Sequence, residues 1–159
     1  MRTKLAVSLT ALTLAFAPPA LAQDAPIRIG TIATLEGAFT TLGEEGMRGI
    51  ELAMEEAGYS AGGRDIEIIS ESSNASPDSA VQAARKLVEN NGVDIVIGPL
   101  SGSEGIAIRD YAKTQPDVTF VNGVSAAQDT TLRQPAENFF RFTTDGAQWM
   151  AGLGEYVVE

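Results

Sequence analysis

Two short turns of small residues carry the clearest chemical potential in this sequence. Ser101-Gly102-Ser103 follows an apolar run that ends at Gly98-Pro99, and it precedes a stretch typical of a helix. Val124-Ser125-Ala126 follows a second apolar run that ends at Asn122-Gly123. Turns of this kind offer backbone N–H groups and hydroxyls, and glycine lets a ligand approach the backbone closely. A helix N-terminus adds the positive end of its dipole, so we expect the first turn to hold a small carboxylate.

A structural interpretation of the same serines stays open. Ser101 or Ser103 could serve only as the N-cap of the following helix, because serine is favoured at that position. Ser125 carries the same ambiguity. The binding interpretation gains support if both turns follow neighbouring parallel strands, since they would then converge on one cleft.

The side chains that most enzymes need are missing. The sequence has no His and no Cys, which excludes Ser/His/Asp and Cys/His nucleophiles and His- or Cys-based zinc sites. The acidic pairs Glu44-Glu45 and Glu55-Glu56 fall on predicted helix surfaces, where solvated carboxylates are ordinary. Phosphate-binding and dinucleotide-binding glycine motifs are absent. We therefore predict a binding protein with no cofactor, and an enzyme that uses carboxylates alone is the alternative.

The charge of the chain points away from nucleic acid. Its formal net charge is −10, and an acidic surface repels phosphate backbones while favouring solubility. We therefore expect a small-molecule ligand and no nucleic-acid partner.

Strand and helix signals alternate along the chain. Apolar, β-branched runs predict five strands, at 27–34, 65–69, 93–97, 118–121 and 139–142. Four helices are expected between and after them, at 45–57, 77–90, from about 102, and from 145 to the end. The crossovers are long enough for parallel pairing, so the pattern predicts an α/β fold with a doubly wound parallel sheet. The last helix should bury one apolar face, formed by Trp149, Met150, Leu153, Tyr156 and Val157.

Details of two crossovers are predicted as well. The segment 35–43 reads as a flexible loop ahead of the first helix, whose apolar face comprises Met47, Ile50, Ala53, Met54 and Ala57. Ser76-Pro77-Asp78 supplies an N-cap, a proline at the first helical position and an acidic first turn for the second helix. That helix should bury Ala80, Val81, Ala84, Leu87 and Val88.

The first 22 residues have the composition of a secretory signal peptide. A basic start, an apolar run over 5–16 and the small-x-small site Ala20-Leu21-Ala22 appear in the expected order. The apolar run is shorter than the roughly 20 residues of a membrane span, which favours a signal peptide over an anchor. We therefore predict an exported protein with a domain over 23–159. Because the sequence stops at Glu159 within a predicted helix, we expect this domain to be incomplete.

In the order and spacing of its motifs, the chain resembles the first lobe of a type I periplasmic solute-binding protein of the branched-chain amino-acid (Leu/Ile/Val) transporter family. The resemblance covers nearly all of 26–159. It rests on 27–30, 37–43, 76–80, 93–103, 122–131 and 140–145. It implies a periplasmic protein that catches a ligand between two lobes and delivers it to an inner-membrane ABC permease.

The resemblance also implies positions for the ligand. Ser101, Gly102 and Ser103 would hold its carboxylate, and Val124, Ser125 and Ala126 would add backbone and hydroxyl contacts. Leu42, in the first loop, would help to cover its side chain. Two positions depart from the leucine binders: Gly102 replaces a serine, and Ala126 replaces a threonine near the ligand amino group. These departures favour a carboxylate without an amino group, such as an aromatic acid.

Other functions remain open at this stage. The same fold resembles amide-sensing and receptor ligand-binding domains, so a ligand-sensing regulatory domain is one alternative. An inactive truncated fragment is another. The sequence leaves the ligand and the oligomeric state undetermined.

Overall fold

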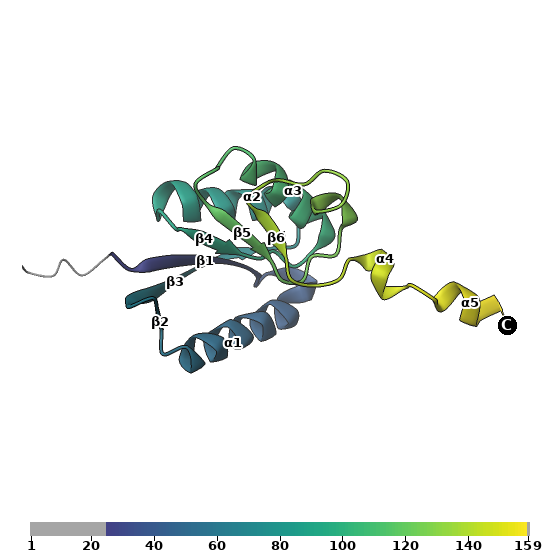
Figure 1. The fold of residues 1–159 in the computed structure, drawn as a ribbon, viewed down its shortest axis with the longest axis horizontal. Helices are drawn as coiled ribbons and strands as arrows, with labels where there is room; N and C mark the ends of the chain where they lie inside the picture. Colours follow the sequence, from purple (N-terminus) through teal and green to yellow (C-terminus); the bar gives the residue numbers. More distant parts are fainter. Residues whose placement is uncertain (1–24, 159) are drawn as a thin grey trace, which may run out of the picture.

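The computed structural model describes residues 25–158, so the signal peptide predicted for 1–22 lies outside the described residues. Its centre is a six-stranded sheet in the order β2-β3-β1-β4-β5-β6 (Figure 1). The strands are β1 (Ile27–Thr34), β2 (Ser60–Ala61), β3 (Arg64–Ser73), β4 (Ile95–Ile97), β5 (Thr119–Asn122) and β6 (Phe139–Arg141). Every neighbouring pair is parallel except β2 and β3.

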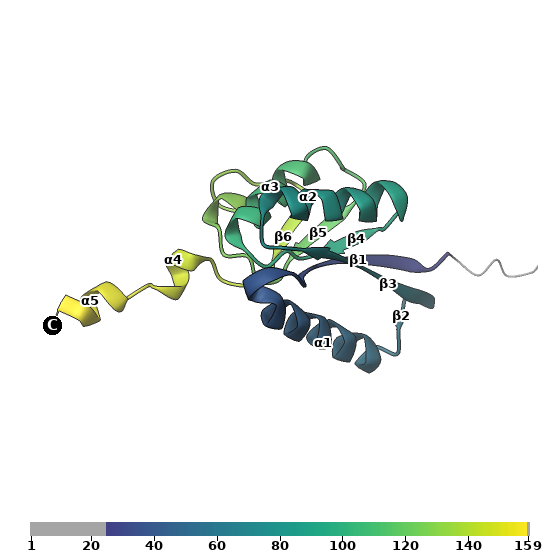
Figure 2. The same cartoon turned by 180° about the vertical axis from the view of Figure 1, so that it is seen from behind.

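Helices cover both faces of this sheet, which confirms the predicted doubly wound α/β fold. The α-helices are α1 (Thr40–Glu56), α2 (Pro77–Arg85), α3 (Gly102–Ala112), α4 (Gly146–Trp149) and α5 (Leu153–Val158). Short 3₁₀ turns span Gly37–Phe39 and Gln128–Thr130, and a π-helical turn, Lys86–Asn90, extends α2. Figures 1 and 2 show α1 on one face and α2 with α3 on the other.

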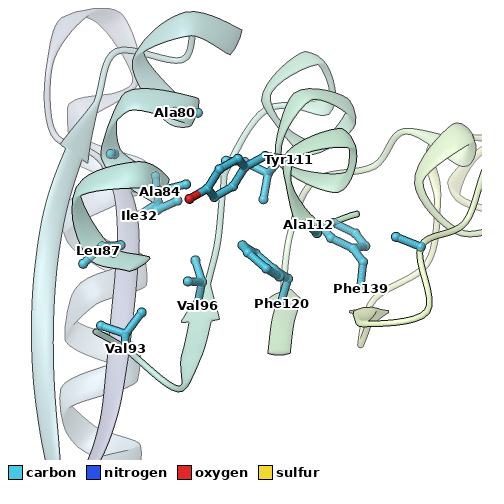
Figure 3. Packing of buried hydrophobic residues seen from close by; sticks show 13 residues of the cluster. Ile32, Ala80, Ala84, Leu87, Val93, Val96, Tyr111, Ala112, Phe120 and Phe139 are labelled. Atoms are coloured by element: carbon cyan, nitrogen blue, oxygen red, sulfur yellow. The ribbon is translucent and has the colours of Figure 1, made fainter. Parts of the chain in front are cut away.

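The main core lies between the sheet and the pair α2 and α3. Figure 3 shows Val96, Phe120 and Phe139, one from each of β4, β5 and β6, pointing toward these helices. On α2 and the π-helical turn that extends it, the predicted core positions Ala80, Ala84 and Leu87 are fully buried, and Val81 and Val88 pack against them partly buried. Full burial of a leucine stabilises a fold by about 1.5–3 kcal/mol. The predicted cap is also confirmed, because the Ser76 hydroxyl accepts the Ser79 N–H.

The helix α1 begins five residues before the predicted start. Its N-cap, Phe39, has no side-chain capping bond, so no local signal marks this end. Packing fixes the start of α1 instead. A Cβ on Gly43 would lie 1.9 Å from the Thr34 carbonyl oxygen, which shows that the first turn of α1 packs directly on the end of β1. The predicted flexible loop at 35–43 is therefore helical over its last part.

The apolar face of α1 is only partly covered. Met47, Ile50 and Met54 are half-buried as this face turns toward the sheet, whereas Ala53 and Ala57 are exposed. The prediction that all five positions form a buried face is therefore confirmed only in part. Figure 2 shows α1 on this side of the sheet, and α2 with α3 on the opposite side.

The strand β2 was not predicted. The chain turns back at Gly62 and Gly63, whose φ angles of 61° and 81° lie in the left-handed region. Ser60 and Ala61 then pair antiparallel with the start of β3. The two glycines therefore make a hairpin that the apolar pattern of the sequence does not indicate.

The predicted single helix after residue 145 is wrong. Gly152, with φ of 84°, separates α4 from α5, and the two short helices extend away from the sheet (Figure 1). The apolar side chains predicted to share a buried face are 48–79% exposed, namely Trp149, Met150, Leu153, Tyr156 and Val157.

No helix within 25–158 is long and apolar enough to cross a membrane.

Candidate ligand-binding site at the carboxyl edge of the sheet

The first candidate turn forms the N-terminus of α3. The Ser101 hydroxyl accepts the Glu104 N–H at 3.3 Å, and the Glu104 carboxylate accepts the Ser101 N–H at 2.9 Å. This reciprocal pair is a capping box, which fixes where the helix begins. The Ser101 hydroxyl also lies 3.2 Å from the Ala75 carbonyl oxygen, to which it donates. The capping interpretation of Ser101 is therefore confirmed, and its hydroxyl is occupied within the fold.

The positions after Ser101 leave donors available. Gly102 and Ser103 occupy the first two helical positions, where backbone N–H groups have no acceptor inside the helix. The Ser103 side chain is exposed and the Gly102 backbone is half-buried. Two amides and the positive end of the helix dipole therefore gather at this point, which suits a carboxylate, and the Ser103 hydroxyl lies beside them, 3.3 Å from that of Ser101.

The second candidate turn is shaped by a buried asparagine at the end of β5. The Asn122 amide group donates to the Ser125 carbonyl at 2.8 Å, and its side-chain oxygen accepts the Val124 N–H at 3.2 Å. These bonds present Val124 outward, where it is 52% exposed. The same bonds turn Ser125 inward.

Ser125 lies inside the fold, and the contact expected between its hydroxyl and a ligand stays a prediction. The side chain is fully buried against α3, and within residues 25–158 its hydroxyl has no hydrogen-bond partner. A Cβ on Gly105 would lie 2.0 Å from that hydroxyl oxygen, which shows how tightly the turn and the helix pack.

The two turns meet, as expected from the parallel pairing of β4 with β5. A Cβ on Gly102 would lie 3.5 Å from the Ala127 Cβ, which is ordinary van der Waals contact. Ala126 is half-buried beside them, and its carbonyl accepts the Gly146 N–H at 2.9 Å. The start of α3 and the turn after β5 therefore form one continuous surface.

An apolar groove adjoins this surface on the α1 side. It has a volume of about 180 Å³ and lies between α1, the ends of β1 and β4, and the turn after β5. Leu42 and Val124 both line it, together with Met47, Ile97 and Leu100. Pockets that enclose a small organic ligand usually measure about 300–1,000 Å³, so this groove matches part of a ligand rather than the whole.

Buried polar residues form a floor beneath the α3 turn. The Ser73 hydroxyl donates to the Glu104 carboxylate at 2.6 Å, and the hydroxyls of Thr34 and Ser73 lie 3.2 Å apart. All three side chains are at most 1% exposed. They join the ends of β1 and β3 to the start of α3. The sequence interpretation missed this group, although Ser101 followed three residues later by Glu104 is a recognisable capping-box pattern.

Two arginines hold the loop between β5 and β6. The Arg141 guanidinium donates to the Ser125 carbonyl at 2.6 Å, and to the Ala127 carbonyl and the Thr130 hydroxyl. Arg109 of α3 is 1% exposed and donates to the Asp129 carbonyl at 2.8 Å. Both guanidinium groups are therefore bonded within the fold.

A buried carboxylate, Asp145, lies at the start of α4. Asp145 caps α4 by accepting the N–H groups of Ala147 and Gln148, each at 2.9 Å. The backbone bond from Gln148 is the main reason that the pKa of Asp145 is lowered, with the Gln128 amide and Arg141 acting in the same direction and burial opposing them. Among residues 25–158, no three acidic, His or Cys side chains cluster in a way that could hold a metal ion.

The arrangement defines a class of protein. The helix N-terminal amides of Gly102 and Ser103 and an apolar groove lie at the carboxyl edge of a mostly parallel sheet, where α/β proteins bind ligands. A family model described as "Periplasmic binding protein" matches residues 26–159. The chain therefore belongs to the periplasmic binding protein family, whose members bind solutes and are not enzymes.

Particular relatives agree with this assignment. The chain is 31% identical over 107 residues to the Leu/Ile/Val-binding protein homolog 8 of Brucella suis, which covers 67% of this chain and 27% of the relative. An ABC transporter substrate-binding protein from Sphaerobacter thermophilus superposes with a TM-score of 0.74 at 30% identity, covering 84% of this chain and 36% of the other. A solute-binding protein from Rhodopseudomonas palustris, in complex with 3,4-dihydroxybenzoic acid, superposes with a TM-score of 0.71 at 24% identity, covering 81% and 37%. The chain thus spans about a quarter of the length of the curated relatives that it matches.

Proposed function

We propose that the chain supplies the first lobe of the solute-binding component of an ABC importer, and that it binds a small carboxylate with an apolar side group. On this proposal the protein is exported through its first 22 residues, acts in the periplasm and delivers its ligand to an inner-membrane permease. The observation that carries the proposal is the juxtaposition of the Gly102 and Ser103 amides with the apolar groove lined by Leu42 and Val124.

The ligand class follows from these two features together. A carboxylate fits the helix N-terminus, and a branched aliphatic or aromatic group fits an apolar groove. The name of the Brucella relative supports a branched-chain amino acid, and the complex of the Rhodopseudomonas protein supports an aromatic acid. Ala126 offers no side-chain hydroxyl for an amino group, which favours the aromatic acid between the two.

A proline substitution can test the backbone contact directly. Gly102 is the first residue of α3, a position where proline is tolerated because its N–H has no partner in the helix. Ser101 has φ of −84° and ψ of 155°, an extended conformation that the residue before a proline prefers. Gly102→Pro therefore removes one proposed donor and keeps the helix, and Gly102→Ala is the matched control that keeps the N–H.

The measurement is an NMR titration of the purified chain with benzoate and, separately, with L-leucine. Losing a hydrogen bond to a charged group costs about 1.5–3 kcal/mol, so Gly102→Pro should weaken carboxylate binding roughly tenfold or more. Gly102→Ala should bind like the wild type. Benzyl alcohol and isoamylamine, which lack the carboxylate, should leave the Ser103 amide signal unmoved. Equal affinity of both variants, or no response of the Ser103 amide to either acid, would refute the proposed subsite.

A further inference from the structure

Glu104 is the one fully buried carboxylate side chain beneath the candidate site within residues 25–158. It belongs to α3, yet its two oxygens face different elements. One oxygen accepts the Ser101 N–H at 2.9 Å, and the other accepts the Ser73 hydroxyl at 2.6 Å. A single side chain therefore bridges the first turn of α3 and the end of β3.

We propose that Glu104 is the positioning residue of the anion-binding turn, acting through these two bonds to aim the amides of Gly102 and Ser103 into the cleft. This inference rests on the proposed function, because it concerns the same turn. Glu104 itself is fully buried below the turn and would not touch the ligand.

The bond from Ser73 to Glu104 supports this turn from outside the helix, in addition to the bond from the Ser101 hydroxyl to the Ala75 carbonyl oxygen. An ordinary capping box uses both of its bonds within the first turn of the helix, and therefore fixes where the helix begins but not where the turn lies in the protein. Here the second carboxylate oxygen is bound to β3, and Thr34 extends the connection to β1 through its hydroxyl, 3.2 Å from that of Ser73. These bonds thus fix the orientation of the first α3 amides relative to β1 and β3.

The charge of Glu104 acts against the site that it supports. A buried carboxylate near a helix N-terminus interacts favourably with the dipole and takes up part of the attraction available to an anionic ligand. Its bonds aid the site through orientation while its charge weakens anion binding. Because the bonds and the charge have opposite effects on anion affinity, variants that remove one or both can distinguish a positioning role from a purely structural one.

Two substitutions of Glu104 exploit the difference. In Glu104→Gln the side-chain oxygen can still accept the Ser101 N–H, and the NH₂ group can donate to Ser73, whose hydroxyl can then donate to Thr34. This variant keeps both bonds and removes the charge. Glu104→Ala removes bonds and charge together.

The experiment measures benzoate affinity from the Ser103 amide signal, alongside thermal unfolding of the same samples. We expect Glu104→Ala to weaken benzoate binding at least fivefold at temperatures where it is folded, and Glu104→Gln to bind as tightly as the wild type or up to severalfold more tightly. If both variants keep wild-type affinity and only their unfolding temperatures fall, Glu104 is structural and the inference is wrong. If the wild type itself gives no response, the proposed function fails instead, so the two failures are distinguishable.

A second pair of variants covers the case in which Glu104→Ala does not fold. Ser73→Ala removes one support of Glu104, and Ser70→Ala is its matched control, because Ser70 accepts the Thr31 hydroxyl at 2.8 Å in the same strand pair but away from α3. Hydrogen exchange of the Ser101 amide should accelerate in Ser73→Ala and not in Ser70→Ala. Equal exchange rates in the two variants would overturn the inference.

Discussion

The packing of α3 against the turn after β5 gives a quantitative prediction for Gly105→Ala. The new Cβ would lie 2.0 Å from the Ser125 hydroxyl oxygen and 2.9 Å from the Ser125 Cβ. Rotation of the hydroxyl can relieve the first contact but not the second, so the backbone of the turn must move. Overpacking of this kind costs about 1–3 kcal/mol. The same substitution also gains the helix propensity of alanine, roughly 1 kcal/mol, which must be measured separately.

Gly49→Ala is the matched control, because Gly49 lies inside α1 and a Cβ there would meet nothing within 4 Å. The propensity gain is common to both variants, so Gly105→Ala should have a free energy of unfolding about 1–3 kcal/mol below that of Gly49→Ala. Urea unfolding followed by circular dichroism measures this difference. In a double-mutant cycle, Ser125→Gly should recover most of the loss. Equal stability of the two alanine variants, or no recovery in the double variant, would refute the described packing.

Three further predictions concern polar groups of the fold. Ser125→Ala should leave the free energy of unfolding unchanged or raise it by about 1 kcal/mol, since it removes a buried hydroxyl that has no partner in the described part of the chain; a clear loss in urea unfolding would show that the hydroxyl is bonded. The pKa of Asp145 is lowered on folding, mainly by the Gln148 N–H, so its stabilising contribution is complete above its ordinary value of 3.8 and is lost as pH falls below 3.8 toward the folded-state pKa. Stability of the wild type should therefore fall more steeply with acid than that of Asp145→Asn, and parallel curves would contradict this. Burial, and then the charge and hydrogen bond of Glu89, raise the pKa of Tyr111 to about 12, so absorbance at 295 nm should show one late tyrosine ionisation that Tyr111→Phe removes. Its persistence in that variant would assign the late step elsewhere.

The features predicted well from sequence were those with a strong local signal. The cap and proline at Ser76-Pro77 and the β-branched run of β1 determine their conformations through nearby residues, and both appear as expected. The early start of α1 could not be predicted, because contact between Gly43 and the end of β1 fixes it across the fold. The break in the last helix had a local signal in Gly152, which the apolar spacing of its neighbours outweighed in the prediction.

The candidate site likewise has features that the sequence predicts and features that it does not. Convergence of the two turns followed from strand adjacency, which the alternating pattern of elements already implied. The inward direction of Ser125 did not follow from sequence, because it depends on the two bonds that Asn122 makes across its turn. The link from Glu104 to Ser73 spans 31 positions and needs the sheet to be assembled first.

The α3 turn and the apolar groove differ in how closely they are connected to the buried core, and substitutions in them therefore differ in their effect on stability. The turn that would hold the carboxylate is continuous with the buried core through α3, so most substitutions beneath it also affect folding. Leu42 and Val124, on the groove side, are 51% and 52% exposed, and substitutions there cost little stability. If the proposed function is right, a lineage of such proteins can exchange one apolar ligand for another by changing the groove alone, while the turn proposed to hold the carboxylate stays the same.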